Sequence, residues 1–91
     1  MALSKVTVID KIEVMEMGQV QVRTATRVLE DGVELSSSFH RHVVEPSTKA
    51  SGSWADTDIS GEDARVQAIC NATWTSAVKT AYQEMIDAQE L

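Results

Sequence analysis

The sequence predicts a small α+β protein, with a three-stranded antiparallel β-meander over residues 5–44 and one or two C-terminal helices packed on one face. Three observations predict this class. Residues 5–44 alternate β-branched and polar side chains, as half-buried strands do. Gly18 and the pair Asp31-Gly32 divide that segment at hairpin spacings. Residues 60–88 instead repeat apolar side chains at helical spacing.

The turn residues predict the register of both hairpins. Asp31-Gly32 is a strong signal for a two-residue type I′ turn, because both positions require a positive φ, and it pairs Glu30 with Val33. Gly18 suits the left-handed position that ends a three-residue loop. If both pairings continue without interruption, apolar side chains gather on one face. That face holds Val6, Val8, Ile12, Val14, Val20, Val22, Val28, Leu35, Phe39 and Val43.

The opposite face of the predicted sheet is polar and carries charges of both signs. It holds Lys11, Glu13, Gln21, Arg23, Arg27, Ser36, Ser38, His40 and His42. Arg41 falls on the apolar face instead, and Ile9 and Val44 fall on the polar face. A β-bulge near a strand end, or a subunit interface over part of the second face, would accommodate all three. Arg41, Ile9 and Val44 are therefore candidate interface residues.

Residues 45–59 are predicted to form a long loop between the sheet and the helices. The segment is rich in Ser, Thr, Gly and acidic residues and contains the only proline. Trp54 is its one aromatic side chain. It either folds back over the edge of the core or contacts a partner, because leaving it in water costs about 2 to 3 kcal/mol. Trp54 is the fourth candidate interface residue.

Two helical segments follow, at about 60–73 and 75–88. The Ser60 hydroxyl can cap the first, and the hydroxyl of Thr75 or Ser76 can cap the second. The pattern leaves open whether one long helix runs through residues 73–75; we expect a break there. The 91 residues form one domain, 1–91, because a chain of this length cannot support two independent cores.

Charge and composition argue against several classes of partner. The net charge is −6, and residues 50–91 contribute −5 of it, which disfavours nucleic acid and anionic membranes. A sheet that binds single strands also needs exposed aromatic side chains, whereas the predicted register turns Phe39 toward the core. An acidic decoy for basic surfaces of another protein remains an alternative. The start MALSK lacks the apolar run of a signal peptide, so we expect an unsecreted protein.

The sharpest chemical candidate is a metal site built on the only two histidines, His40 and His42. Residues two apart on a strand point the same way, and neutral imidazoles bind zinc, nickel or iron. Glu13 is the nearest candidate carboxylate. The predicted register places Arg23 opposite His40, however, and a cation there opposes a bound metal. We therefore expect no cofactor, and a metal-binding module or metal-dependent enzyme is the alternative function.

No catalytic residues are predicted. Cys70 lies in the apolar stripe of the first helix, where free cysteines are commonly small core residues. No phosphate-binding glycine loop, Cys-x-x-Cys pair or catalytic serine motif occurs.

Three segments carry a resemblance to a protein group: DKIEVMEMGQVQVR, EDGVELSSSFHRHVVEP and ISGEDARVQAICNATWT. On these segments the chain resembles short uncharacterised proteins of marine bacteriophages and phage-like environmental sequences. The resemblance spans most of the chain except the segment around residues 47–58. It implies a phage accessory or virion-associated protein, located in the host cytoplasm or the virion, and brings no catalytic residues with it.

These observations favour a non-enzymatic structural or interaction protein that acts as a homo-oligomer. Strands of about eleven residues are ~35 Å long, more than two short helices can cover. Exposed strand edges then invite pairing with another copy, through residues 5–15 or 33–44. A phage or host protein is a further candidate partner.

Overall fold

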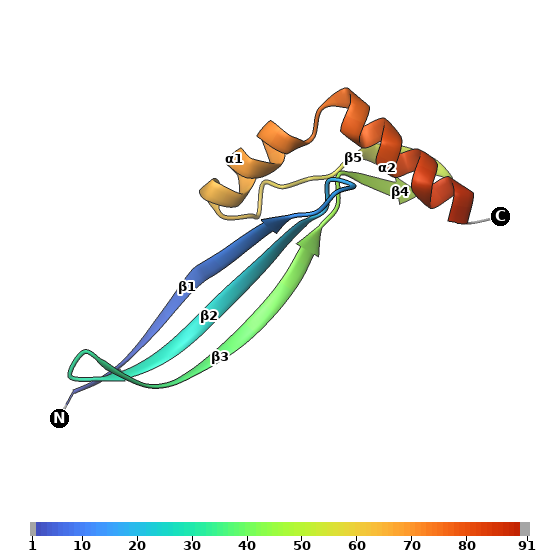
Figure 1. The fold of residues 1–91 in the computed structure, drawn as a ribbon. Coiled ribbons are helices and arrows are strands. Elements are labelled where there is room, and N and C mark those ends of the chain that lie inside the picture. Colours follow the sequence, from blue (N-terminus) through green and yellow to red (C-terminus); the bar gives the residue numbers. More distant parts are fainter. Residues whose placement is uncertain (1, 90–91) are drawn as a thin grey trace.

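The computed structural model describes residues 2–89 and confirms the α+β class (Figure 1). An antiparallel sheet in the order β1-β2-β3 is followed by a second, two-stranded sheet and two helices. The elements are β1 Leu3–Val14, β2 Val20–Glu30, β3 Val33–Val44, β4 Ser47–Ala50, β5 Ser53–Asp56, α1 Ala64–Thr73 and α2 Ser76–Gln89.

The three-stranded sheet projects well beyond the helices. Both helices and the small sheet lie at one end of it, beside the β1–β2 turn and the end of β3, whereas the β2–β3 turn lies at the far end (Figure 1). The molecule measures 58 × 25 × 23 Å, and its radius of gyration is 17.1 Å. A compact chain of this length has a radius of gyration of about 12 Å. The helices therefore cover only the inner end of the sheet.

The predicted turns are present. Asp31 and Gly32 have φ values of 51° and 84°, as a type I′ turn requires, and they pair Glu30 with Val33. At the other turn, Gly18 has a φ of 90° and donates its amide hydrogen to the Met15 carbonyl at 3.0 Å. Both hairpins therefore begin in the predicted register.

A bulge in β1 ends the predicted register of the first hairpin. Ile12 pairs with Val22 as expected, but Asp10 is an extra residue, and the pairing resumes with Ile9 opposite Thr24. Ile9 thereby joins the face of Val22, while Val6 and Val8 move to the other face. The prediction that Val6 and Val8 belong to the core face is wrong for this reason.

A second bulge, at Leu35, displaces most of β3. Phe39 pairs with Ala25 rather than Thr24, and His40 takes the place opposite Thr24. Because side chains alternate along a strand, one extra residue moves all later side chains to the opposite face. The predicted core positions of Phe39 and Val43 are therefore wrong, and His40, His42 and Val44 lie on the face that the helices partly cover.

The core forms where the inner end of the sheet meets α1. Its buried members are Val20, Val22, Val44, Val66, Cys70 and Trp74. Ile9 packs against this cluster and is partly buried, and Val44 is only 6% exposed. The Val44 side chain is therefore not available to a partner, which corrects its prediction as an interface residue, whereas Ile9 keeps part of its surface exposed.

The predicted loop over residues 45–59 contains a hairpin. β4 and β5 pair around a turn in which Ser51 and Gly52 have φ values of 52° and 80°. Trp54 on β5 packs edge-on against Tyr82 of α2, with ring centroids 6.1 Å apart, and its indole nitrogen donates to Asp87 at 3.3 Å. Trp54 therefore folds back onto its own chain, one of the two outcomes expected for it.

The helices begin and end at identifiable residues. Asp63, and not the predicted Ser60, caps α1 by accepting the Arg65 amide hydrogen at 2.9 Å. Trp74, with φ and ψ of −87° and 72°, ends this helix. The Thr75 hydroxyl oxygen then accepts from the Val78 amide at 3.3 Å at the start of α2. The expected break is confirmed, so the segment forms two helices.

Candidate interaction surface

The side of the sheet turned away from the core presents a largely solvent-facing mixture of apolar and charged side chains, which we call the Phe39 face. It comprises Val6, Val8, Asp10, Lys11, Arg23, Ala25, Arg27, Phe39, Arg41 and Val43. Phe39 is 54% exposed and Val43 is 51% exposed. Large apolar side chains at this exposure on one sheet face are typical of a contact surface.

The centre of the Phe39 face is a row of three neighbouring apolar side chains, one from each strand. Val8 and Phe39 flank Ala25 on the two neighbouring strands, and Ala25 is fully buried although it lies on the face turned away from the core. The Arg23 guanidinium lies 4.5 Å from the centroid of the Phe39 ring, in cation–π contact. The row is therefore held in a defined arrangement by the sheet's own side chains.

The bulge residue Asp10 fixes Arg23 in this position. Its two carboxylate oxygens accept from Arg23 Nη2 at 2.7 Å and Nε at 3.0 Å, a bidentate pair. The hydrogen bond to Arg23 lowers the pKa of Asp10 and raises the pKa of Arg23. Both groups are charged at neutral pH, and the pair holds the guanidinium over the Phe39 ring.

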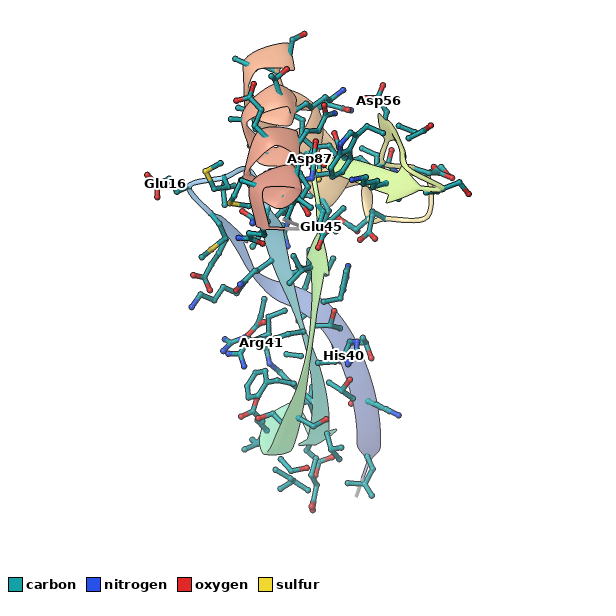
Figure 2. The ribbon with its side chains drawn as sticks, turned by 90° about the vertical axis from the view of Figure 1, so that its right-hand side faces the viewer. Glu16, His40, Arg41, Glu45, Asp56 and Asp87 are labelled. Atoms are coloured by element: carbon teal, nitrogen blue, oxygen red, sulfur yellow. The ribbon has the colours of Figure 1, made fainter. Side chains whose placement is uncertain are left out.

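The charged side chains around the apolar part of the Phe39 face differ in whether they have an ion-pair partner. Arg27 pairs with Glu34 at 3.4 Å near the outer end. Arg41 is exposed and has no ion-pair partner between residues 2 and 89. Arg41 and His40 point away from opposite sides of the sheet (Figure 2). Of the four predicted interface residues, Arg41 is exposed, Ile9 and Trp54 are partly buried, and Val44 is buried.

The two histidines lie on the other face of the sheet. His42 Nε2 is 2.8 Å from Glu62 Oε1, just before α1, and the rings of His40 and His42 are 6.5 Å apart. Glu13 pairs with Gln21 in the row of Val43, so it lies on the Phe39 face and cannot join the histidines. Thr24 stands opposite His40, and the predicted opposition by Arg23 is wrong.

The two histidine side chains do not belong to a complete set of metal ligands among residues 2–89. Within the described part of the chain, no group of three or more His, Cys, Asp or Glu side chains is placed to hold a metal ion. Cys70 lies in the core, where burial raises the pKa of its thiol, so the reactive thiolate is disfavoured.

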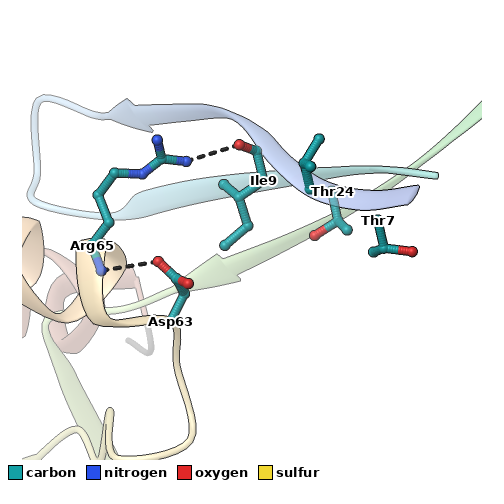
Figure 3. Close-up of a pocket in the computed structure, with 6 residues that line it drawn as sticks. Thr7, Ile9, Thr24, Asp63 and Arg65 are labelled. Carbon is teal, nitrogen blue, oxygen red and sulfur yellow. Dashed lines mark hydrogen bonds between the residues drawn. The ribbon is translucent and has the colours of Figure 1, made fainter. Parts of the chain in front are cut away.

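An open pocket lies between the start of α1 and the covered face of the sheet (Figure 3). Its lining residues are Thr7, Val8, Ile9, Thr24, Asp63 and Arg65. Arg65 Nη2 donates to the Ile9 carbonyl at 2.8 Å, and Asp63 caps its own helix. The Arg65 side chain thus attaches α1 to β1.

Comparisons with protein-family models, with curated proteins and with solved structures find no match. No helix between residues 2 and 89 is long and apolar enough to cross a membrane.

Sequence reasoning missed the Phe39 face because it missed the two bulges. The signal was present, since Arg41, Ile9 and Val44 did not fit the uninterrupted register. Moving these three residues to the opposite face removes all three conflicts at once.

Proposed function

We propose that this protein is a non-enzymatic structural or interaction protein that self-associates through its projecting sheet. The observation that carries this proposal is the position of Phe39, 54% exposed on a part of the sheet that the helices do not reach. Exposing such a side chain, together with Val43 at 51% and Leu35 at 57%, forfeits hydrophobic stabilisation that a second copy can restore.

The total surface area supports association. The chain exposes 6036 Å², whereas a compact monomer of 10.0 kDa exposes about 5200 Å². The excess of about 800 Å² is close to the area that each partner buries in a standard interface. If a second copy on the projecting sheet buried about this area, the exposed area of the chain would therefore fall to that of a compact monomer.

Resemblance to phage proteins favours a component of a phage particle as the setting for this association. Mass spectrometry of purified particles tests that setting. A defined copy number in the particle supports a virion-associated role, whereas absence from particles favours a role inside the host cell.

Light scattering over a protein concentration series tests self-association itself. The expected result is a mass that rises with concentration and falls back toward the monomer in Phe39→Ser. Met15→Ser is the matched control, because Met15 is also an exposed apolar side chain, at 42%, but lies at the inner turn. A monomer at every concentration would contradict the proposal, as would equal effects of the two substitutions.

A further inference from the structure

We infer that two copies pair β3 against β3, antiparallel and about a two-fold axis perpendicular to the sheet, to form one continuous six-stranded sheet. This inference rests on the proposed self-association and specifies its surface, direction and register. It selects β3 and not β1 as the pairing edge.

The outer edge of β3 is open along most of its length. β3 is an edge strand that pairs only with β2 in the described sheet, and each of its residues from Val33 to Arg41 is exposed. The backbone N–H and C=O groups on its outer side therefore face water, as a template for another strand. Ser36, Ser37 and Ser38 occupy the middle of this edge with small side chains, which allow close approach.

β1, the other edge, carries features that oppose pairing. The bulge at Asp10 interrupts its ladder near the middle, and Lys5 and Lys11 place charges on either side of that bulge. The Ile9 carbonyl accepts a hydrogen bond from Arg65, so α1 already contacts this edge. From Ser36 to Val44, β3 has no bulge, lysine or proline.

The charges along β3 select an antiparallel partner. Glu34 lies near the outer end of the strand, and Arg41 lies toward the inner end, on the same face. Antiparallel pairing brings the acidic end of one copy against the basic end of the other, whereas parallel pairing brings like charges together. Arg41, which has no ion-pair partner within residues 2–89, would gain one.

These charges also favour one register, centred on Ser38. In that register Ser38 of one copy pairs with Ser38 of the other, and Ser37 pairs with Phe39 of the other copy. Arg41 lies opposite Leu35 of the other copy, next to Glu34. The two Phe39 side chains become diagonal neighbours on the same face, roughly 7 to 8 Å apart at the backbone, which is within reach of aromatic rings. Contact between the two rings then removes part of each exposed Phe39 side chain from water, which is the hydrophobic gain that the proposed self-association needs.

Charge exchange tests the direction and register of pairing. We expect Arg41→Glu and Glu34→Arg each to weaken self-association by about tenfold, as loss of a close charge pair does. The double variant should return to within about threefold of the wild type, because the two charges meet again with signs reversed. Lys79→Asp with Asp56→Lys exchanges an ion pair of 2.9 Å between α2 and β5, away from the three-stranded sheet, and should change nothing.

Disulfide trapping tests the contact itself. Ser38→Cys should form a covalent dimer under mild oxidation, because residues facing each other across an antiparallel pair have Cα atoms about 4.5 to 5.5 Å apart. Ser4→Cys on the β1 edge and the wild type, whose Cys70 is buried, should not. Circular dichroism of each variant verifies that the sheet is retained.

The outcomes separate this inference from the proposed function. Self-association without trapping at Ser38→Cys, trapping at Ser4→Cys, or a double charge variant no better than the single ones would overturn β3 pairing and leave self-association standing. A monomer at all concentrations would overturn both.

Discussion

The indole nitrogen of Trp74 donates a 2.7 Å hydrogen bond to the carbonyl oxygen of Gly18. This buried contact joins the end of α1 to the turn between β1 and β2, residues 56 positions apart. It holds the helices at the inner end of the sheet, and it therefore determines which part of the sheet projects into solvent.

Substitution of Gly18 should loosen this junction. A Cβ atom there would lie 2.5 Å from Val78 Cγ1 and 3.0 Å from Pro46 Cγ, in a backbone conformation with a φ of 90°. We expect Gly18→Ala to lower the free energy of unfolding by about 2 to 4 kcal/mol, because clash and backbone strain add. Gly32→Ala is the matched control, with a φ of 84° and nothing within 4 Å, and should cost about 1 kcal/mol. Urea denaturation measures both, and equal costs would contradict the close approach.

Trp74→Phe should destabilise the same junction by a different route. The aromatic volume is largely kept, but the buried Gly18 carbonyl loses its donor, which costs about 1 to 3 kcal/mol. Urea denaturation monitored by circular dichroism gives the free energy. An unchanged free energy would mean that water replaces the indole as donor.

Tyr82 should make the protein less stable in alkali. Its side chain is 3% exposed, and burial together with a hydrogen bond to Glu45 raises its pKa to about 12 from 10. Because the unfolded chain releases the proton first, the stabilisation is complete below pH 10 and is lost as the pH rises to about 12. The loss amounts to about 2 to 3 kcal/mol.

The phenolate absorbance of Tyr82, the only tyrosine, measures this titration directly. Tyr82→Phe should remove the alkaline loss of stability over that interval. Titration of the folded protein at the ordinary tyrosine value would contradict the prediction.

Asp10 should stabilise the fold only at pH values at which its carboxyl group is ionised. The bidentate hydrogen bond to Arg23 lowers its pKa from the ordinary value of 3.8. The stabilisation is therefore present above pH 3.8 and is lost as the pH falls through the lowered value. Asp10→Asn should flatten this part of the pH profile of unfolding and release Arg23 from its position over Phe39. An identical acid profile in Asp10→Asn would show that the pair does not stabilise the fold.

Metal analysis should find no stoichiometric zinc, nickel or iron bound to the purified protein. His40 and His42 share one face of the sheet, but within residues 2–89 no group of three His, Cys, Asp or Glu side chains is placed to hold a metal ion. Added Zn²⁺ should leave the melting temperature unchanged. Stoichiometric metal that is lost in His40→Ala/His42→Ala would overturn this and favour the metal-binding alternative.

The sequence predicted the structure correctly where one or two residues determine the local backbone conformation. Asp31-Gly32 and Gly18 specified both turns, because their positive φ values leave few other conformations. The alternation of apolar and polar residues predicted the three strands, and the capping hydroxyl of Thr75 predicted the break between the helices. The hairpin over residues 47–56 was missed, because its strands have only four residues each and lack the apolar alternation of a longer strand.

Only the tertiary structure decided which side chains of those strands face the core. The bulges at Asp10 and Leu35 are single extra residues that no local signal requires, yet each reverses the faces of all later pairs. Asp10 gains a bidentate bond to Arg23, and Val44 and Ile9 gain places in the core, so long-range contacts accompany each shift. The sequence by itself determined the elements and their order, through backbone conformation. Packing against the helices determined that Phe39 and Arg41 face solvent, because that energy depends on residues distant in the chain.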